Sequence, residues 1–74
     1  MDEANLEINK NLALDIIMNN IAKITQQYSM EKDKNKSIQL KEKTNILNRI
    51  KDEIYKGNLE IINKVINKNQ EGIL

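Results

Sequence analysis

Hydrophobic residues occupy two long segments of the chain, which are separated by the polar stretch 31–37, EKDKNKS. In both segments they recur three and four residues apart, which is the spacing of heptad positions a and d and not the alternation of a strand. The pattern predicts an all-α antiparallel helical hairpin of two long helices, at about 2–28 and about 38–70, with a bend at about 31–37. The residues of this seam are Leu14, Ile17, Ile21, Ile24, Tyr28, Leu40, Leu47, Ile50 and Ile54.

The position of the bend predicts a register for the hairpin. Folding the chain there pairs residues whose numbers sum to about 68, so that Ile17 lies opposite Ile50 or Lys51 and Tyr28 lies opposite Leu40. If the chain is instead one unbroken helix through Asn35, the same pairs form between two chains, as an antiparallel pair of rods.

The second helix contains one ambiguous point, the pair Gly57 and Asn58. Glycine followed by asparagine is a common helix stop, and the asparagine could cap a new helix. However, the apolar stripe keeps its phase across the pair at 100° per residue. We therefore expect the helix to continue, with a break into a third helix at 58–68 as the alternative.

Three polar or small residues are expected to mark the helix ends. Asp2 and Ser37 are the predicted N-caps of the two helices, and Gly72 is able to end the second helix.

Both helices carry apolar residues outside the seam, which a two-helix hairpin would leave in water. We expect these residues to form the interface of a homodimer, in which two hairpins make a four-helix bundle. On this interpretation Ile62→Asp dissociates the dimer, whereas Ile17→Asp unfolds the hairpin. The predicted interface residues are Leu12, Ile16, Met18, Tyr55, Leu59, Ile62 and Ile66.

The composition supports self-association. A chain of 74 residues makes one small domain, and it contains neither cysteine nor histidine. Disulfides and structural zinc, the usual means of stabilising a domain of this size, are therefore excluded, and oligomerisation remains. The lack of cysteine also fits a reducing cytoplasm, where we expect the protein to reside.

Charge and hydropathy argue against a membrane as partner and give little support to nucleic-acid binding. The 12 basic and 11 acidic residues leave a net charge of +1, so no strong field attracts DNA, RNA or anionic lipid. The acidic start MDEANLEINK has no features of a signal peptide. The densest apolar run, 12–18, is interrupted by Asp15 and is too short to span a bilayer.

Catalytic chemistry is hard to assemble from these residues. There is no histidine or cysteine, and the two glycines do not form a phosphate-binding loop. The adjacent Asp52 and Glu53 point about 100° apart on a helix, and no spacing of oxygen ligands resembles a calcium loop. The sequence predicts no enzyme, no catalytic residue, no cofactor and no metal site.

The favoured function is a non-enzymatic, self-associating protein–protein interaction module, either an adaptor or regulator or an accessory product of a phage or mobile element. The alternative is a nucleic-acid-binding regulator that uses 44–68 as a helix-turn-helix. In that case Asn63, Lys64, Asn67 and Lys68 would contact base edges and phosphates.

Overall fold

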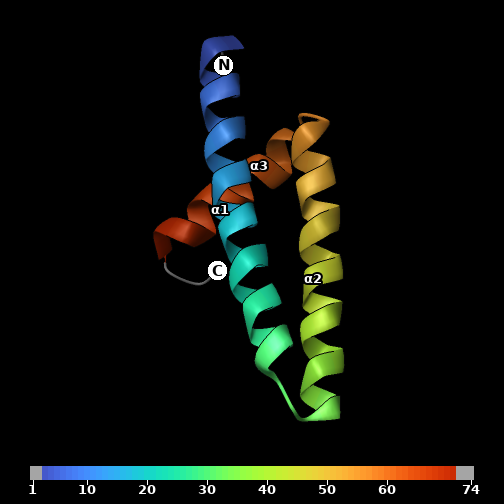
Figure 1. Cartoon of the computed structure of the whole chain (residues 1–74). Helices are drawn as coiled ribbons and strands as arrows, with labels where there is room; N and C mark the ends of the chain where they lie inside the picture. Colours follow the sequence, from blue (N-terminus) through green and yellow to red (C-terminus); the bar gives the residue numbers. More distant parts are fainter. Residues whose placement is uncertain (1–2, 72–74) are drawn as a thin grey trace.

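The fold is all-α, as predicted from the hydrophobic pattern. A computed structural model describes residues 3–71 and contains three helices and no strand in that range, α1 (Glu3–Met30), α2 (Lys34–Tyr55) and α3 (Leu59–Glu71). Helices α1 and α2 run antiparallel, and α3 crosses the end of the hairpin that lies away from the bend (Figure 1). The predicted helix ends at Asp2 and Gly72 lie outside the described residues.

The bend is shorter than predicted, because α2 begins at Lys34. Asp33 is the N-cap, and its Oδ1 accepts hydrogen bonds from the backbone N–H groups of Asn35 at 2.9 Å and Lys36 at 3.3 Å. The prediction of Ser37 as the cap is wrong, since its own N–H already donates to the Asp33 carbonyl at 2.9 Å within the first turn. Aspartate is as good a cap as serine, so the helix begins after the earlier residue, inside the polar stretch.

The second helix does not continue through Gly57, so the expectation of a continuous helix is wrong. Gly57 has a φ of +83°, its N–H donates to the Ile54 carbonyl, and the Asn58 N–H donates to the Glu53 carbonyl. These two bonds form a Schellman motif, which satisfies the last carbonyls of α2 and turns the chain. Asn58 then starts α3, because its Oδ1 accepts from the Ile61 N–H at 3.3 Å.

The core lies where the three helices meet, away from the bend. Its buried residues come from all three helices and are Ala13, Ile16, Ile17, Ile54, Ile62 and Val65. Towards the bend only two helices pack together, and seam residues such as Ile21 and Leu47 are half-buried. The crossing of α3 therefore concentrates the close packing at one end of the hairpin.

Candidate interaction surface

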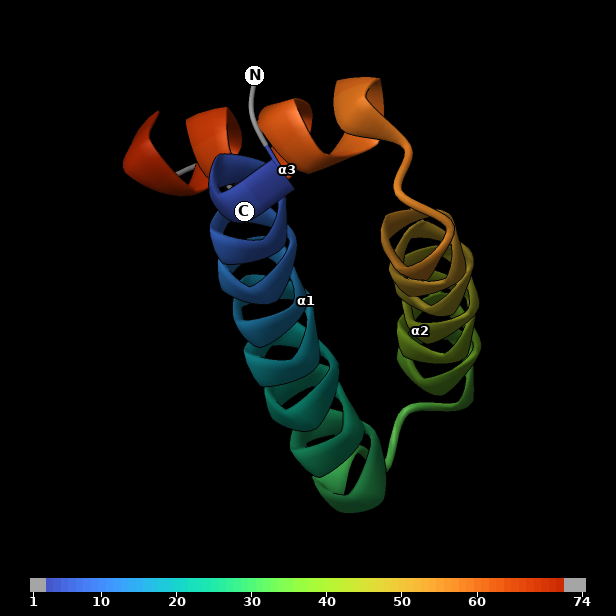
Figure 2. The same cartoon turned by 90° about the horizontal axis from the view of Figure 1, so that it is seen from above.

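Helix α3 covers only one face of the hairpin, as the view from above shows (Figure 2). On α1 the covered side carries Ala13 and Ile16, both buried. Met18 follows Ile16 by two residues and so points about 160° away from it, and its side chain is 52% exposed. Met18 therefore lies on the face that α3 leaves uncovered.

The same argument places Tyr55 of α2. Glu53 is hydrogen-bonded to Asn58 at the start of α3, and Tyr55 points about 160° away from Glu53. Tyr55 is 54% exposed. Met18 and Tyr55 thus share one face of the hairpin, here called the open face, with half-buried Leu14 between them in the antiparallel register. Lys51, half-buried and about 40° from Tyr55 around α2, lies on the same face opposite Met18. The open face comprises Leu14, Met18, Thr25, Tyr28, Lys41, Thr44, Asn45, Lys51 and Tyr55.

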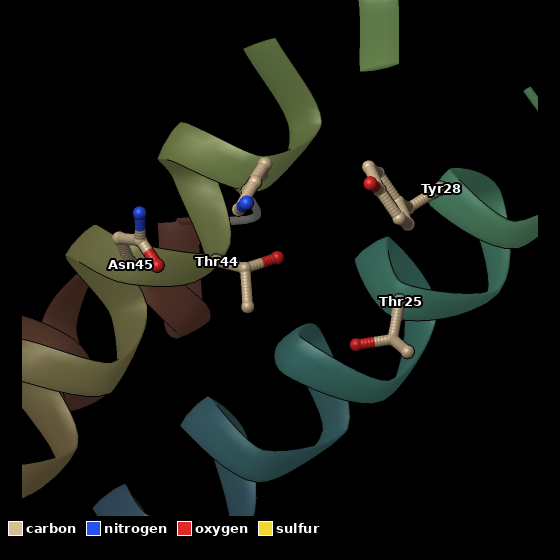
Figure 3. Close-up of a pocket in the computed structure, with 5 residues that line it drawn as sticks. Thr25, Tyr28, Thr44 and Asn45 are labelled. Atoms are coloured by element: carbon tan, nitrogen blue, oxygen red, sulfur yellow. The ribbon is translucent and has the colours of Figure 1, made fainter. Parts of the chain in front are cut away.

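Towards the bend, the open face is hollowed between α1 and α2 into a pocket of about 260 Å³, here called the polar pocket after the polar residue types that line it (Figure 3). Its lining residues are Thr25, Tyr28, Lys41, Thr44 and Asn45. The Thr44 hydroxyl donates to the Leu40 carbonyl at 3.0 Å. Most of the accessible surface of the pocket comes from carbon atoms, and the other donors among its lining residues are the Lys41 ammonium, the Asn45 amide and the hydroxyls of Thr25 and Tyr28. The pocket therefore suits a group that has both an apolar part and hydrogen-bond acceptors.

The pocket also bears on the predicted register. Thr25 and Tyr28 of α1 meet Lys41 and Thr44 of α2 in it, in pairs whose numbers sum to about 68, as the bend predicts. Further from the bend, Ile17 and Ile50 line one hollow beneath α3, in the predicted pairing. These pairs form within one chain, because α1 ends at Met30 and α2 begins at Lys34, whereas the rod alternative requires an unbroken helix through Asn35.

The seven predicted interface residues do not form one surface. Ile16 and Ile62 are buried in the core, because α3 packs on the side of α1 that a bare hairpin would expose. Ile66 is half-buried against the same core, while Leu59 is exposed at the start of α3. Leu12 is exposed, but it points about 120° away from Met18 on α1.

Only Met18 and Tyr55 of the predicted set reach the open face. Sequence reasoning assigned Leu14 to the seam and missed the polar pocket. The heptad spacing of Met18 and Thr25 could have revealed it, because residues seven apart lie on the same side of a helix.

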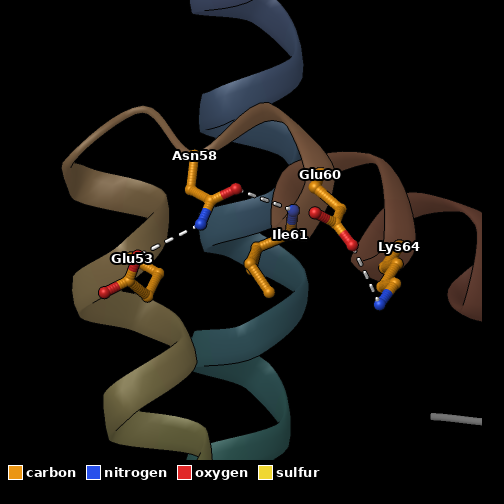
Figure 4. Close-up of polar contacts among 5 residues, drawn as sticks. All are labelled: Glu53, Asn58, Glu60, Ile61 and Lys64. Carbon is orange, nitrogen blue, oxygen red and sulfur yellow. Dashed lines mark hydrogen bonds and ion pairs between the residues drawn. The ribbon is translucent and has the colours of Figure 1, made fainter.

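Four polar residues of α3 are exposed, namely Asn63, Lys64, Asn67 and Lys68. Lys64 and Lys68 also line the hollow that contains Ile17 and Ile50. Lys64 forms an ion pair with Glu60, with Nζ and Oε1 3.4 Å apart (Figure 4). A carboxylate therefore offsets part of the positive charge of this surface.

Two further classes of site are absent from the described part of the chain. Within residues 3–71 no cluster of three or more acidic side chains could hold a metal ion. None of the three helices, over the residues described, has both the length and the apolar character needed to cross a membrane.

No family model matches the chain, and no curated protein or solved structure matches it either.

Proposed function

We propose that this protein is a small, non-enzymatic protein–protein interaction module that self-associates through the open face. The observation that supports the proposal is the pair of large apolar side chains, Met18 and Tyr55, each more than half exposed beside half-buried Leu14. No other helix of the described chain covers this face. Single exposed apolar residues are ordinary on protein surfaces, whereas a group aligned on one face is typical of an interaction site.

The small core gives a second reason. Six buried side chains, gathered at one end of the hairpin, form the core of the described residues. The sequence contains no cysteine that could add a disulfide. Domains of this size often gain the missing stability from association, and a second layer of helices on the open face would bury Leu14, Met18 and Tyr55.

Sedimentation velocity over a range of protein concentrations tests the proposal. The wild-type protein should sediment as a dimer, and Met18→Glu should sediment as a monomer with its helical content intact. Ile38→Glu is the matched control, because Ile38 is 49% exposed and lies on the opposite side of α2 from the seam residue Leu47. This variant should remain dimeric. A wild-type protein that stays monomeric at high micromolar concentration would rule out self-association.

An adaptor or regulator of this kind acts by presenting a helical surface to other proteins, and we place it in the cytoplasm on the basis of its lack of cysteine. An accessory role for a phage or mobile element is compatible with the same surface.

A nucleic-acid-binding regulator is the second candidate, and the break at Gly57 favours it. Helix α2, a three-residue turn and α3 have the connectivity of a helix-turn-helix, and the second helix carries the exposed Lys64 and Lys68. Titration with duplex DNA at low and moderate salt separates the two functions. Salt-dependent binding that is lost in the Lys64→Ala, Lys68→Ala double variant would support the regulator. A dimer that does not bind DNA would support the interaction module.

A further inference from the structure

We propose that the open face packs on the open face of a second copy in the antiparallel sense, so that Glu7 of each copy enters the polar pocket beside Lys41 of the other. This inference rests on the proposed self-association and adds the orientation of the two copies and the polar contact that sets it. Three features of the chain support it, namely the spacing along α1, the distribution of charge and the chemistry of the pocket.

The spacing along α1 brings the two groups to the same level. Glu7 is exposed and lies on the same side of α1 as Met18, eleven residues earlier, which is about 16 Å along the axis. Tyr28 lies ten residues beyond Met18, about 15 Å in the other direction, and lines the pocket together with Lys41. A two-fold axis near Met18, perpendicular to the helices, therefore brings Glu7 of one copy to the pocket of the other. The same axis brings the two Met18 side chains together at the centre.

The distribution of charge favours this orientation over the parallel one. Residues 21–45, which form the half of the hairpin near the bend, contain six basic and three acidic residues of the 12 and 11 in the chain. The other half of the hairpin, residues 3–20 and 46–55, contains three basic and five acidic residues. Antiparallel packing places the positive half of one copy on the negative half of the other, whereas parallel packing places positive on positive.

The residues that line the pocket include a cation and several hydrogen-bond donors for a carboxylate, beside carbon surface for its methylene stem. Lys41 supplies an ammonium group, and Asn45, Thr25 and Tyr28 supply further hydrogen-bond donors around a volume of about 260 Å³. Hydrogen bonds from charged donors to a carboxylate are the strong kind. Among the charged side chains of the open side of α1 that the structure describes, Glu7 is the one at the matching level.

Charge reversal at the two positions tests the contact. Glu7→Lys and Lys41→Glu should each raise the dimer dissociation constant about tenfold, because each creates two repulsive pairs per dimer. The double variant should return to within about threefold of the wild type, since the pairs are restored with opposite sign. Lys43→Glu is the matched control, because Lys43 lines a different hollow on the other side of the hairpin, and its effect should stay within about twofold.

Cysteine cross-linking tests the orientation, because the natural chain contains no cysteine. Asn11 and Thr25 lie seven residues before and after Met18, on the same side of α1. Met18→Cys should cross-link to itself, and a mixture of Asn11→Cys and Thr25→Cys should cross-link to each other but not to themselves. A wild-type monomer would overturn the self-association itself. A dimer without the mixed cross-link, or one that the double charge variant does not restore, would overturn the orientation alone.

Discussion

The side-chain amide of Asn58 donates a hydrogen bond to the Glu53 carboxylate, with Nδ2 and Oε2 3.2 Å apart, across the break between α2 and α3 (Figure 4). The other end of the same amide caps α3 through the Ile61 N–H. One side chain therefore joins the last turn of α2 to the first turn of α3, at the point where the path of α3 over the core is determined.

Replacing Asn58 with alanine should lower the free energy of unfolding by about 1–2 kcal/mol, because the N-cap and the bond to Glu53 are lost together. The free energy of unfolding of Asn58→Ser should lie between those of the wild type and Asn58→Ala. Serine can cap the helix, but its side chain is too short to replace the amide that binds Glu53. The measurement is urea denaturation followed by circular dichroism. Asn67→Ala, at an exposed position of the same helix, should change the free energy by no more than about 0.5 kcal/mol. Equal effects at the two positions would contradict a special role for Asn58.

Glu53 should make the stability of the fold depend on pH. The hydrogen bond from Asn58, and then the charge of Lys56 with Nζ 3.5 Å from Oε1, lower the pKa of Glu53 from its ordinary value of 4.5. A carboxyl group whose pKa is lower in the folded state stabilises the fold above its unfolded pKa and loses this effect as the pH falls through the folded value.

The stability advantage of the wild type over Glu53→Gln should therefore be constant near neutral pH and should shrink as the pH falls through the ordinary carboxyl pKa and below it. Unfolding free energies measured at a series of pH values, for both proteins, test this. Asn58→Ala should show a weaker pH dependence than the wild type, because the larger cause of the lowered pKa is absent. A difference between the wild type and Glu53→Gln that grows on acidification would contradict the assigned sign.

The sequence predicted the helices well, because their periodicity depends only on which side of each helix meets apolar neighbours. The same property explains the error at Gly57. Ile54, Ile61 and Val65 stay in phase whether the helix continues or turns back, since they face the hairpin in both cases. The spacing of apolar residues gives their angle around a helix but not the direction of the helix axis. The crossing of α3 over the hairpin could therefore not be predicted from the pattern.

The assignment of Ile16 and Ile62 to an exposed surface is wrong for the same reason. Whether Ile16 is exposed depends on where α3 passes, whereas the exposure of Met18 and Tyr55 does not. The polar pocket could not be predicted, because it forms only where particular side chains of α1 and α2 lie opposite one another. Which residues lie opposite one another is known only when the position of the bend is known to within one residue. The choice between Asp33 and Ser37 as the cap decides that position.

Ile62 is a core residue like Ile17, and not an interface residue as the sequence predicts. The outcome expected for substitutions of Ile62 changes accordingly. Both side chains are fully buried, so Ile62→Asp should unfold the protein as Ile17→Asp does and should not release a folded monomer. The milder variants Ile62→Ala and Ile17→Ala should each cost about 2–5 kcal/mol. Ile8→Ala is the control, at a position 64% exposed, and should cost no more than about 0.5 kcal/mol. A folded, monomeric Ile62→Asp protein would contradict the core position of Ile62 and would support its assignment to the dimer interface.

Gly57 allows a test in which the two arrangements of the chain predict opposite signs. In the broken arrangement its φ of +83° is the left-handed conformation, and a Cβ would meet no atom within 4 Å, so backbone strain alone decides the cost of a side chain. Gly57→Ala should therefore destabilise the protein by about 1–2 kcal/mol, and Gly57→Asn should cost less because asparagine tolerates this conformation. In a continuous helix Gly57→Ala would instead stabilise by about 1 kcal/mol, since alanine is the better helix former. Urea denaturation of the three proteins distinguishes the two arrangements. A break between α2 and α3 requires the wild type to be the most stable, Gly57→Asn to be intermediate and Gly57→Ala to be the least stable.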